Sequence, residues 1–257
     1  MTLRPALIAL LLPALLPAVG QAARPFDARD MVTLDRVSSP TLSPDGRKLV
    51  VAVREVDYEA NKASAGLWIE DLLARDAAPP VRFTAEAMSV NSPAFSPDGA
   101  RVYFLSAQSG SQQLWRQDVA GGEAVQVTDF PLDIGSYKLS PDGKAVAVSL
   151  EVFPDCADLA CTRSRLDEKA AAKTTGVVYD KLFVRHWDTW MDGRVNQLYV
   201  AGFGADGKAT GEPVRLGGSV LGDIPSKPFG DASEYTWAPD GQSIVYSVRA
   251  ADRGEAW

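Results

Sequence analysis

A four-residue turn phrase returns along this chain and constrains its fold more than any other feature. Each copy combines a small residue, a proline that presets φ near about −65°, an aspartate that bonds its own backbone, and a glycine that accepts positive φ. These are the residues of a tight turn. Three copies read Ser-Pro-Asp-Gly and one reads Ala-Pro-Asp-Gly, at residues 43–46, 96–99, 140–143 and 238–241.

Short apolar runs lie on both sides of these turns. Runs rich in β-branched or aromatic residues that are bounded by turn signals indicate buried strands. The phrase is therefore predicted to join two strands of a hairpin. The runs that follow the turns are 49–53, 102–105, 145–148 and 244–248, and shorter candidates precede the later turns at 93–95, 137–139 and 235–237. A polar link is expected at 57–65, before a third strand at 67–72.

The turns begin at residues 43, 96, 140 and 238, which are 53, 44 and 98 residues apart, and 98 is twice 49. Repeats of about 40 to 50 residues with four short strands are typical of β-propeller blades. We predict an all-β fold, a partial propeller of about three and a half four-stranded blades. Trp68 and Trp115 share one place in their repeats, as do Thr84 and Thr128, and we expect both tryptophans in the core.

The spacing of 98 residues between the third and fourth turns is interpreted as one enlarged third blade. Its third and fourth strands reappear only at 197–200 and 212–216, so an insertion occupies about 153–196. Within it, residues 162–173 lack glycine and proline and are rich in helix formers, which favours a short helix. A propeller ring needs about four to eight blades to close. We therefore expect residues 23–257 to be the N-terminal part of a longer propeller.

The first 22 residues resemble a secretory signal peptide. Arg4 precedes the nearly continuous apolar run 6–19, and small residues at 20 and 22 suit cleavage before Ala23. Pro13 and Pro17 argue against a bilayer-spanning helix. The predicted location is the periplasm or the exterior, with no membrane span once the signal is removed.

The formal net charge of −7 disfavours a nucleic-acid partner, since such proteins cluster Lys and Arg against phosphates. Cys156 and Cys161 are the two cysteines, and in an exported chain they are expected to form a disulfide. A metal site is the less favoured alternative because His186 is the only histidine. No metal or other cofactor is expected.

Serine hydrolases carry a nucleophile on a strained turn, a histidine base and an orienting acid. The sequence contains no Gly-x-Ser-x-Gly, and His186 is favoured as a structural residue, so no catalytic residue is assigned. The best candidate for a ligand surface is the aromatic and charged run in the insertion, where an aspartate beside indoles suits a cationic group. Alternatively, this run binds no ligand and only packs the insertion against its own blade. The candidate residues are Arg185, His186, Trp187, Asp188 and Trp190.

Residues 179–190, read with the signal peptide, the turn phrases and the segment 227–231, resemble the propeller half of exported prolyl-oligopeptidase-family serine peptidases. The likeness is to the dipeptidyl-peptidase 5 and acylaminoacyl-peptidase-like branch. It implies a propeller that gates and binds short peptides. It further implies a C-terminal α/β-hydrolase domain, absent from this chain, that supplies the catalytic Ser, Asp and His and removes dipeptides or blocked residues from peptide N-termini.

A second interpretation is a non-enzymatic periplasmic propeller of the TolB type, which binds protein partners. That type places a separate α/β domain between the signal and the first blade. Here the first turn follows the proposed cleavage site by only about 20 residues. The residues leave both a monomer and a homodimer open.

Overall fold

The computed structural model describes residues 24–74, 79–179, 184–217, 220 and 222–248. The predicted signal peptide lies outside the described residues. A short helix, α1 (Ala28–Thr33), precedes the first strand, and its start is fixed by a capping box in which Asp27 and Asp30 each accept a backbone N–H of the other.

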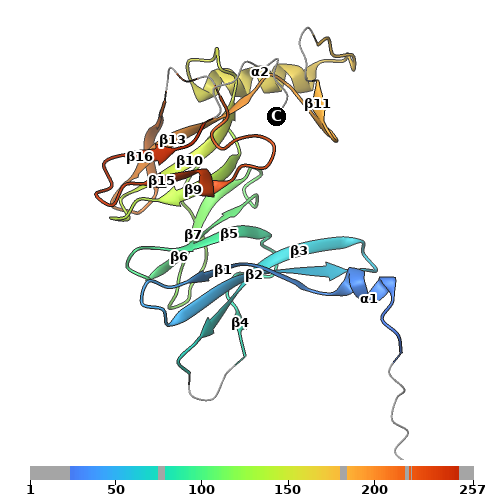
Figure 1. Ribbon diagram of the computed structural model, residues 1–257, viewed down its shortest axis with the longest axis vertical. Coiled ribbons are helices and arrows are strands. Elements are labelled where there is room, and N and C mark those ends of the chain that lie inside the picture. The colour runs from blue at the N-terminus through green and yellow to red at the C-terminus, as the bar shows by residue number, and fades with distance from the viewer. Residues whose placement is uncertain (1–23, 75–78, 180–183, 218–219, 221, 249–257) are drawn as a thin grey trace, which may run out of the picture.

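Successive antiparallel sheets make up the rest of the described chain (Figure 1). Three have four strands and the last has two. The first three contain β1 (Arg36–Leu42), β2 (Lys48–Asp57), β3 (Lys62–Asp71), β4 (Val81–Arg82); β5 (Val90–Phe95), β6 (Arg101–Ser106), β7 (Gln113–Asp118), β8 (Val125–Gln126); and β9 (Ile134–Leu139), β10 (Ala145–Val152), β13 (Val195–Phe203), β14 (Ala209–Arg215). The last sheet pairs β15 (Tyr235–Trp237) with β16 (Ile244–Tyr246), after the 3₁₀ turn η1 (Ala232–Glu234).

The turn phrases form the predicted hairpins between the first two strands of each sheet. In the third copy the Ser140 hydroxyl donates to Asp142 at 2.6 Å and accepts the N–H of Ala145 at 2.9 Å. The first two copies repeat both bonds, and all four glycines have φ of 69 or 70°. Ala238 lacks the hydroxyl, so the fourth turn relies on backbone bonds and on Asp240, which accepts the N–H of Gln242.

The turns stack on one another from sheet to sheet. A Cβ placed on Gly99 would lie 3.4 Å from Cδ of Pro44, and one on Gly143 would lie 3.5 Å from Cδ of Pro97. Gly241 faces Pro141 in the same way at 3.8 Å. Because the same face of each turn meets its neighbour, the first strands β1, β5, β9 and β15 are arranged around a shared axis.

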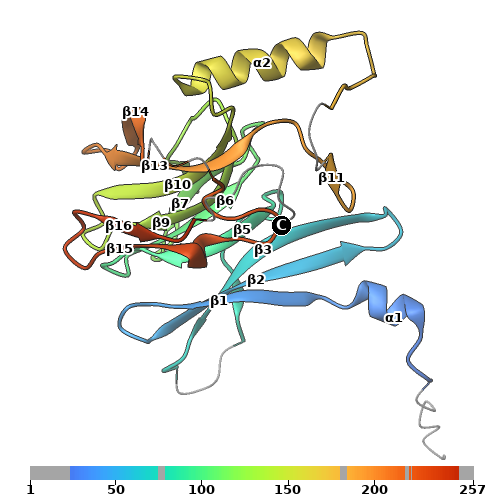
Figure 2. The same cartoon turned by 45° about the horizontal axis from the view of Figure 1, so that its top comes forward.

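Three apolar clusters fill the spaces between neighbouring sheets. One joins the first and second sheets through residues such as Leu67 and Phe104, and one joins the second and third through residues such as Leu105 and Val148. The third includes Leu198 and Tyr235 and joins the third sheet to the last. Figures 1 and 2 show the same face-to-face stacking, which is the packing of propeller blades. The partial propeller expected from the sequence is therefore confirmed.

The enlarged third blade has the expected topology. β10 pairs directly with β13, from Ala145 opposite Gly202 to Val152 opposite Val195, so the chain between them lies outside the sheet. It contains the Cys156–Cys161 disulfide, which confirms the expected pairing, then α2 (Leu159–Ala171) and the small hairpin of β11 (Arg185–His186) and β12 (Thr189–Trp190).

Two details differ from the sequence-based expectations. The first blade's second and third strands extend through most of the stretch expected to be a polar link, with Asp57 paired to Lys62, because the hairpin continues beyond the sheet. Trp68 and Trp115 are half-buried, since the third strand of a blade has only one short outer strand beside it. Their equivalent threonines, Thr84 and Thr128, are buried and accept the N–H of the residue before each tryptophan.

Replacing Ser140 with alanine should lower the free energy of unfolding by about 1–3 kcal/mol, because the part-buried N–H of Ala145 loses the buried Ser140 hydroxyl as its acceptor. Urea unfolding of the whole protein measures this change. Ala238→Ser is the matched reverse change and should raise stability by about 1 kcal/mol, since it restores the missing hydroxyl. Equal effects of serine and alanine at both positions would contradict this account of the turn.

Because the aspartates of the first three turns have lowered pKa values, the free energy of unfolding should decrease at acidic pH. The Ser96 hydroxyl and the N–H of Ala100 hold the pKa of Asp98 below its usual value. A group whose pKa is lower in the folded state stabilises fully above its unfolded pKa of about 3.9, and this contribution is lost as the pH falls through the folded pKa. The stability difference between wild type and Asp98→Asn should therefore shrink between pH 6 and pH 3. Urea midpoints across that range measure it, and a constant difference would argue against the hydrogen-bonded carboxylate.

Candidate functional site

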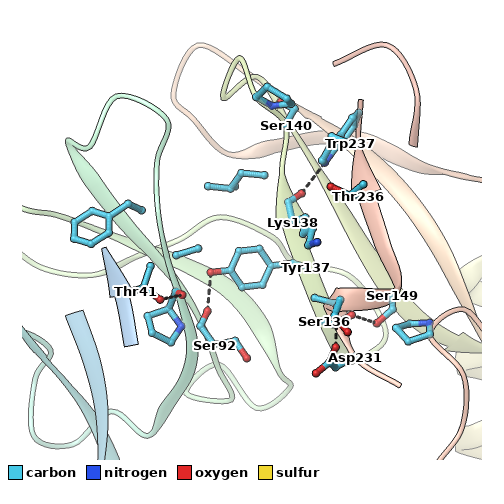
Figure 3. Close-up of a pocket in the computed structure, with 18 of the residues that line it drawn as sticks. Thr41, Ser92, Ser136, Tyr137, Lys138, Ser140, Ser149, Asp231, Thr236 and Trp237 are labelled. Carbon is cyan, nitrogen blue, oxygen red and sulfur yellow. Dashed lines mark hydrogen bonds between the residues drawn. The ribbon is translucent and has the colours of Figure 1, made fainter. Parts of the chain in front are cut away.

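A pocket of about 870 Å³ lies where the first strands of the sheets meet (Figure 3). β1, β5, β9 and β15 all contribute to its wall, together with the prolines of three turn phrases and the segment that leads into η1. We call it the axial pocket. Residues that line it include Thr41, Ser92, Tyr137, Lys138, Asp231 and Trp237.

Hydrogen bonds between neighbouring blades fix the wall of the axial pocket. Thr41 donates to the carbonyl of Pro93 at 3.1 Å, and the Tyr137 hydroxyl donates to the carbonyl of Ser92 at 2.8 Å. Trp237 Nε1 donates to the carbonyl of Lys138 at 3.0 Å. Burial raises the pKa of Tyr137 well above its usual value, so its hydroxyl remains a neutral donor at physiological pH. These three hydrogen bonds therefore hold neighbouring inner strands together along the wall of the pocket.

Lys138 and a group of hydroxyls form the polar corner of this pocket. Lys138 Nζ donates to the carbonyl of Tyr235 at 2.7 Å. The Ser136 hydroxyl lies 2.9 Å from that of Ser149 and 3.0 Å from that of Tyr235. Asp231, which Figure 3 places beside Ser136 and Ser149, accepts the N–H of Ser233, and hydrogen bonds from the side chain and then the backbone of Ser233 lower its pKa. This corner offers an acidic group and neutral hydroxyls to a ligand.

The five predicted ligand residues lie together on the β11–β12 hairpin, outside the axial pocket. Arg185 pairs with Trp190 across the two strands, and His186 pairs with Thr189. Trp187 and Asp188 form the turn between the strands. The two indoles are 73% and 56% exposed, and Asp188 is also exposed. The sequence therefore identified a real surface feature, whose role in binding stays a prediction.

Aromatic rings pack on both ends of this hairpin. The rings of His186 and Trp187 have centroids 5.0 Å apart, and the ring of Phe229 lies 5.8 Å from the first and 5.5 Å from the second. At the other end the Arg185 guanidinium lies 5.3 Å from the centre of the Trp190 ring. The surface formed by His186, Trp187, Asp188, Trp190 and Phe229 is called the aromatic hairpin surface below.

The backbone of Trp187 has φ of +47°, which is rare for a bulky side chain. Such a conformation costs on the order of 1–3 kcal/mol and commonly marks a functional position. Glycine or asparagine would form the same turn with less strain. The turn itself therefore does not require an indole at this position.

Phe229 connects the aromatic hairpin surface to the axial pocket. It is 72% exposed, and the two residues that follow it, Gly230 and Asp231, line the pocket. Two residues before it, Lys227 forms an ion pair with Glu151 of β10, and Glu151 also binds Arg194 at 2.8 Å. Arg194 follows the hairpin in the chain, so one carboxylate holds both the hairpin's exit and the Phe229 segment.

Sequence reasoning missed the axial pocket and the role of Phe229. Tyr137, Lys138 and Trp237 were recognised only as parts of strands, and Phe229 only as part of a resemblance. Their place just before the turn phrases is the signal that could have located the pocket, because every inner strand faces the propeller axis. The contact of Phe229 with His186, 43 residues earlier in the chain, follows no sequence pattern.

No group of three or more His, Cys, Asp or Glu side chains within the described ranges is arranged to hold a metal ion. None of the helices in this part of the chain is long and apolar enough to cross a bilayer.

The packing of Phe229 on the hairpin predicts an NMR signature. Ring currents from Trp187 and Phe229 should displace the ring-proton resonances of His186, the chain's only histidine. Phe229→Ala should shift these resonances while changing the free energy of unfolding by less than about 0.5 kcal/mol, because the side chain is largely exposed. His186→Gln assigns the signals, and Val245→Ala, another largely exposed apolar residue, is the control. Unmoved resonances would show that the rings are not packed in solution.

Comparison with known proteins identifies the family. No protein-family model matches the chain. Dipeptidyl-peptidase 5 of Porphyromonas gingivalis is 31% identical over 228 residues, and that of Porphyromonas endodontalis is 28% identical over 220. Both alignments cover 85% of this chain and 30% of the relative, so the chain spans less than a third of the relatives' length.

A solved acylaminoacyl peptidase, in complex with Z-Gly-Gly-Phe-chloromethyl ketone, has the same fold over 85% of this chain and 28% of its own, with a TM-score of 0.56 and 15% identity. Sequence and fold therefore agree with the resemblance that the turn phrases and the insertion suggested. The chain belongs to the prolyl oligopeptidase family, is similar in sequence to dipeptidyl-peptidase 5, and forms a segment of the β-propeller.

Proposed function

We propose that this chain is the substrate-gating and substrate-binding propeller of an exported serine exopeptidase that removes dipeptides or blocked residues from peptide N-termini. The observation that carries the proposal is the 31% identity to a dipeptidyl-peptidase 5 over 228 residues. Residues 1–22 serve as the signal peptide, and the protein acts in the periplasm or outside the cell. Short peptides are its substrates.

The axial pocket and the aromatic hairpin surface support peptide binding. Peptides carry backbone amides, apolar side chains and a terminal ammonium, and the two features offer hydroxyls, aromatic rings and carboxylates. The segment 225–231 joins them, so one extended ligand can contact both. Loops and insertions held by rigid sheets are common places for such contacts.

Asp188 is the proposed partner of the substrate's N-terminal ammonium. It is exposed, and no hydrogen bond or ion pair engages it within the described part of the chain. The indole faces of Trp187 and Trp190 add cation–π attraction for the same ammonium. A charge-assisted hydrogen bond of this kind contributes about 1.5–3 kcal/mol.

Catalysis is assigned to an α/β-hydrolase domain encoded beyond residue 257, which holds the Ser, Asp and His. The open reading frame that contains this sequence is the direct test. We expect it to complete the propeller and then to encode Gly-x-Ser-x-Gly followed by Asp and His. A stop codon directly after Trp257 would remove this part of the proposal.

The TolB-type alternative has less support, because the alignment to dipeptidyl-peptidase 5 covers 85% of the chain. A stable protein partner, together with absence of peptidase activity in the full-length product, would favour that alternative.

Asp188→Asn should raise KM about tenfold or more for dipeptidyl-4-methylcoumaryl-7-amides with a free amine, and leave kcat nearly unchanged. The factor follows from losing about 1.5–3 kcal/mol of ammonium binding. N-acetylated versions of the same substrates should show no such increase. Glu123→Gln, which removes another exposed carboxylate from a loop between outer strands, is the control. Unchanged kinetics with the free-amine substrates would exclude Asp188 from the site.

A further inference from the structure

A second hollow of about 560 Å³ lies beside α1 and the long β2–β3 hairpin. Val32 of α1 forms one side of it, and residues of the first three strands form the rest. The lining residues are Val32, Arg36, Arg54, Val56, Asp57, Tyr58, Asn61, Lys62 and Ala63.

Two arginines lie next to each other in the wall of this hollow. Arg36 of β1 is the direct cross-strand partner of Arg54 of β2, so their Cβ atoms lie on the same face of the sheet. Like charges in this arrangement are unfavourable unless something neutralises them. No ion pair or hydrogen bond within the described ranges engages either guanidinium.

The surrounding charges do not neutralise this pair. Lys62 also lines the hollow, but it is the direct cross-strand partner of Asp57, and strand alternation puts both on the other face of the sheet from Arg54. Asp57 is the one carboxylate in the described wall, and its Oδ1 accepts the N–H of Ala60. Arg29, next to the hollow, is already paired with Glu59 and lies over the Tyr58 ring. The hollow therefore has an excess positive charge on a chain whose net charge is −7.

The remaining wall is apolar. Val56 and Ala63 are cross-strand partners, and alternation along β2 puts Val56 on the same face as Arg54. Val32 lies opposite, on α1. A ligand that fits this combination has a negative group for the two guanidiniums and a small apolar part for the three aliphatic side chains.

We propose that this hollow binds a small organic carboxylate with an aliphatic body, the chemistry shared by a peptide's C-terminal residue and a short acyl chain. Arg36 and Arg54 hold the carboxylate through charge-assisted hydrogen bonds. Val32, Val56 and Ala63 contact the aliphatic part. The site is separate from the aromatic hairpin surface, which is proposed to bind an ammonium, so neither proposal depends on the other.

The test is ligand-observed NMR with the full-length protein and N-acetylleucine, which has the carboxylate and aliphatic body but no ammonium. N-acetylleucinamide, which lacks only the negative charge, should bind at least about tenfold more weakly. Each of Arg36→Gln and Arg54→Gln should weaken N-acetylleucine binding about tenfold or more, as expected for loss of one charged hydrogen bond. Hexanoate, which has the carboxylate and an aliphatic chain, is the second probe. Tighter binding of hexanoate than of N-acetylleucine would indicate a short acyl chain as the ligand, and the reverse order would indicate a peptide's C-terminal residue.

Arg47→Gln, which removes an exposed arginine of the first turn, is the matched control and should leave binding unchanged. The two pocket variants should unfold at the wild-type Tm or slightly above it, because no ion pair among the described residues is lost and the repulsion between the two arginines is removed. Equal binding of acid and amide, or binding that neither arginine substitution weakens, would overturn the proposal.

Discussion

Stacking of the turn phrases around the propeller axis is the constraint on which the rest of the structure depends. Each turn joins the first two strands of its sheet, and the glycines of the second, third and fourth turns meet the proline of the preceding turn. The serine hydroxyl closes the hairpin from within, by accepting a backbone N–H five residues later. These contacts fix the direction of every inner strand, and the wall of the axial pocket consists mainly of inner strands.

The enlarged third blade connects this scaffold to the surface with the most distinctive chemistry. Because β10 and β13 pair directly, the insertion leaves and re-enters the sheet at the same end. The disulfide and α2 occupy its first half, and the β11–β12 hairpin occupies the second. Glu151 at that end of β10 binds both Lys227 and Arg194. One half-buried carboxylate therefore positions two segments that are more than 30 residues apart in the chain.

Local patterns accounted for much of the fold, and their limits have physical causes. The helix expected at 162–173 begins at Leu159, because Asp158 caps it by accepting the N–H of Cys161 at 2.8 Å. The polar stretch after Val53 was interpreted as a link, yet paired strands continue through it to Asp57 and Lys62. A strand that projects from its sheet has few neighbours, so it buries little and lacks the apolar pattern that identifies strands.

The sequence by itself determined the repeat, the turn type, the antiparallel hairpins, the enlarged blade and the disulfide. All of these depend on residues close together in the chain, where proline, glycine and β-branched side chains restrict φ and ψ locally. Only the tertiary structure decided that Phe229 packs on His186 and Trp187, that four inner strands enclose one pocket, and that Arg36 faces Arg54. These contacts join distant segments, and their geometry is set by blade packing and strand register, which no local preference specifies.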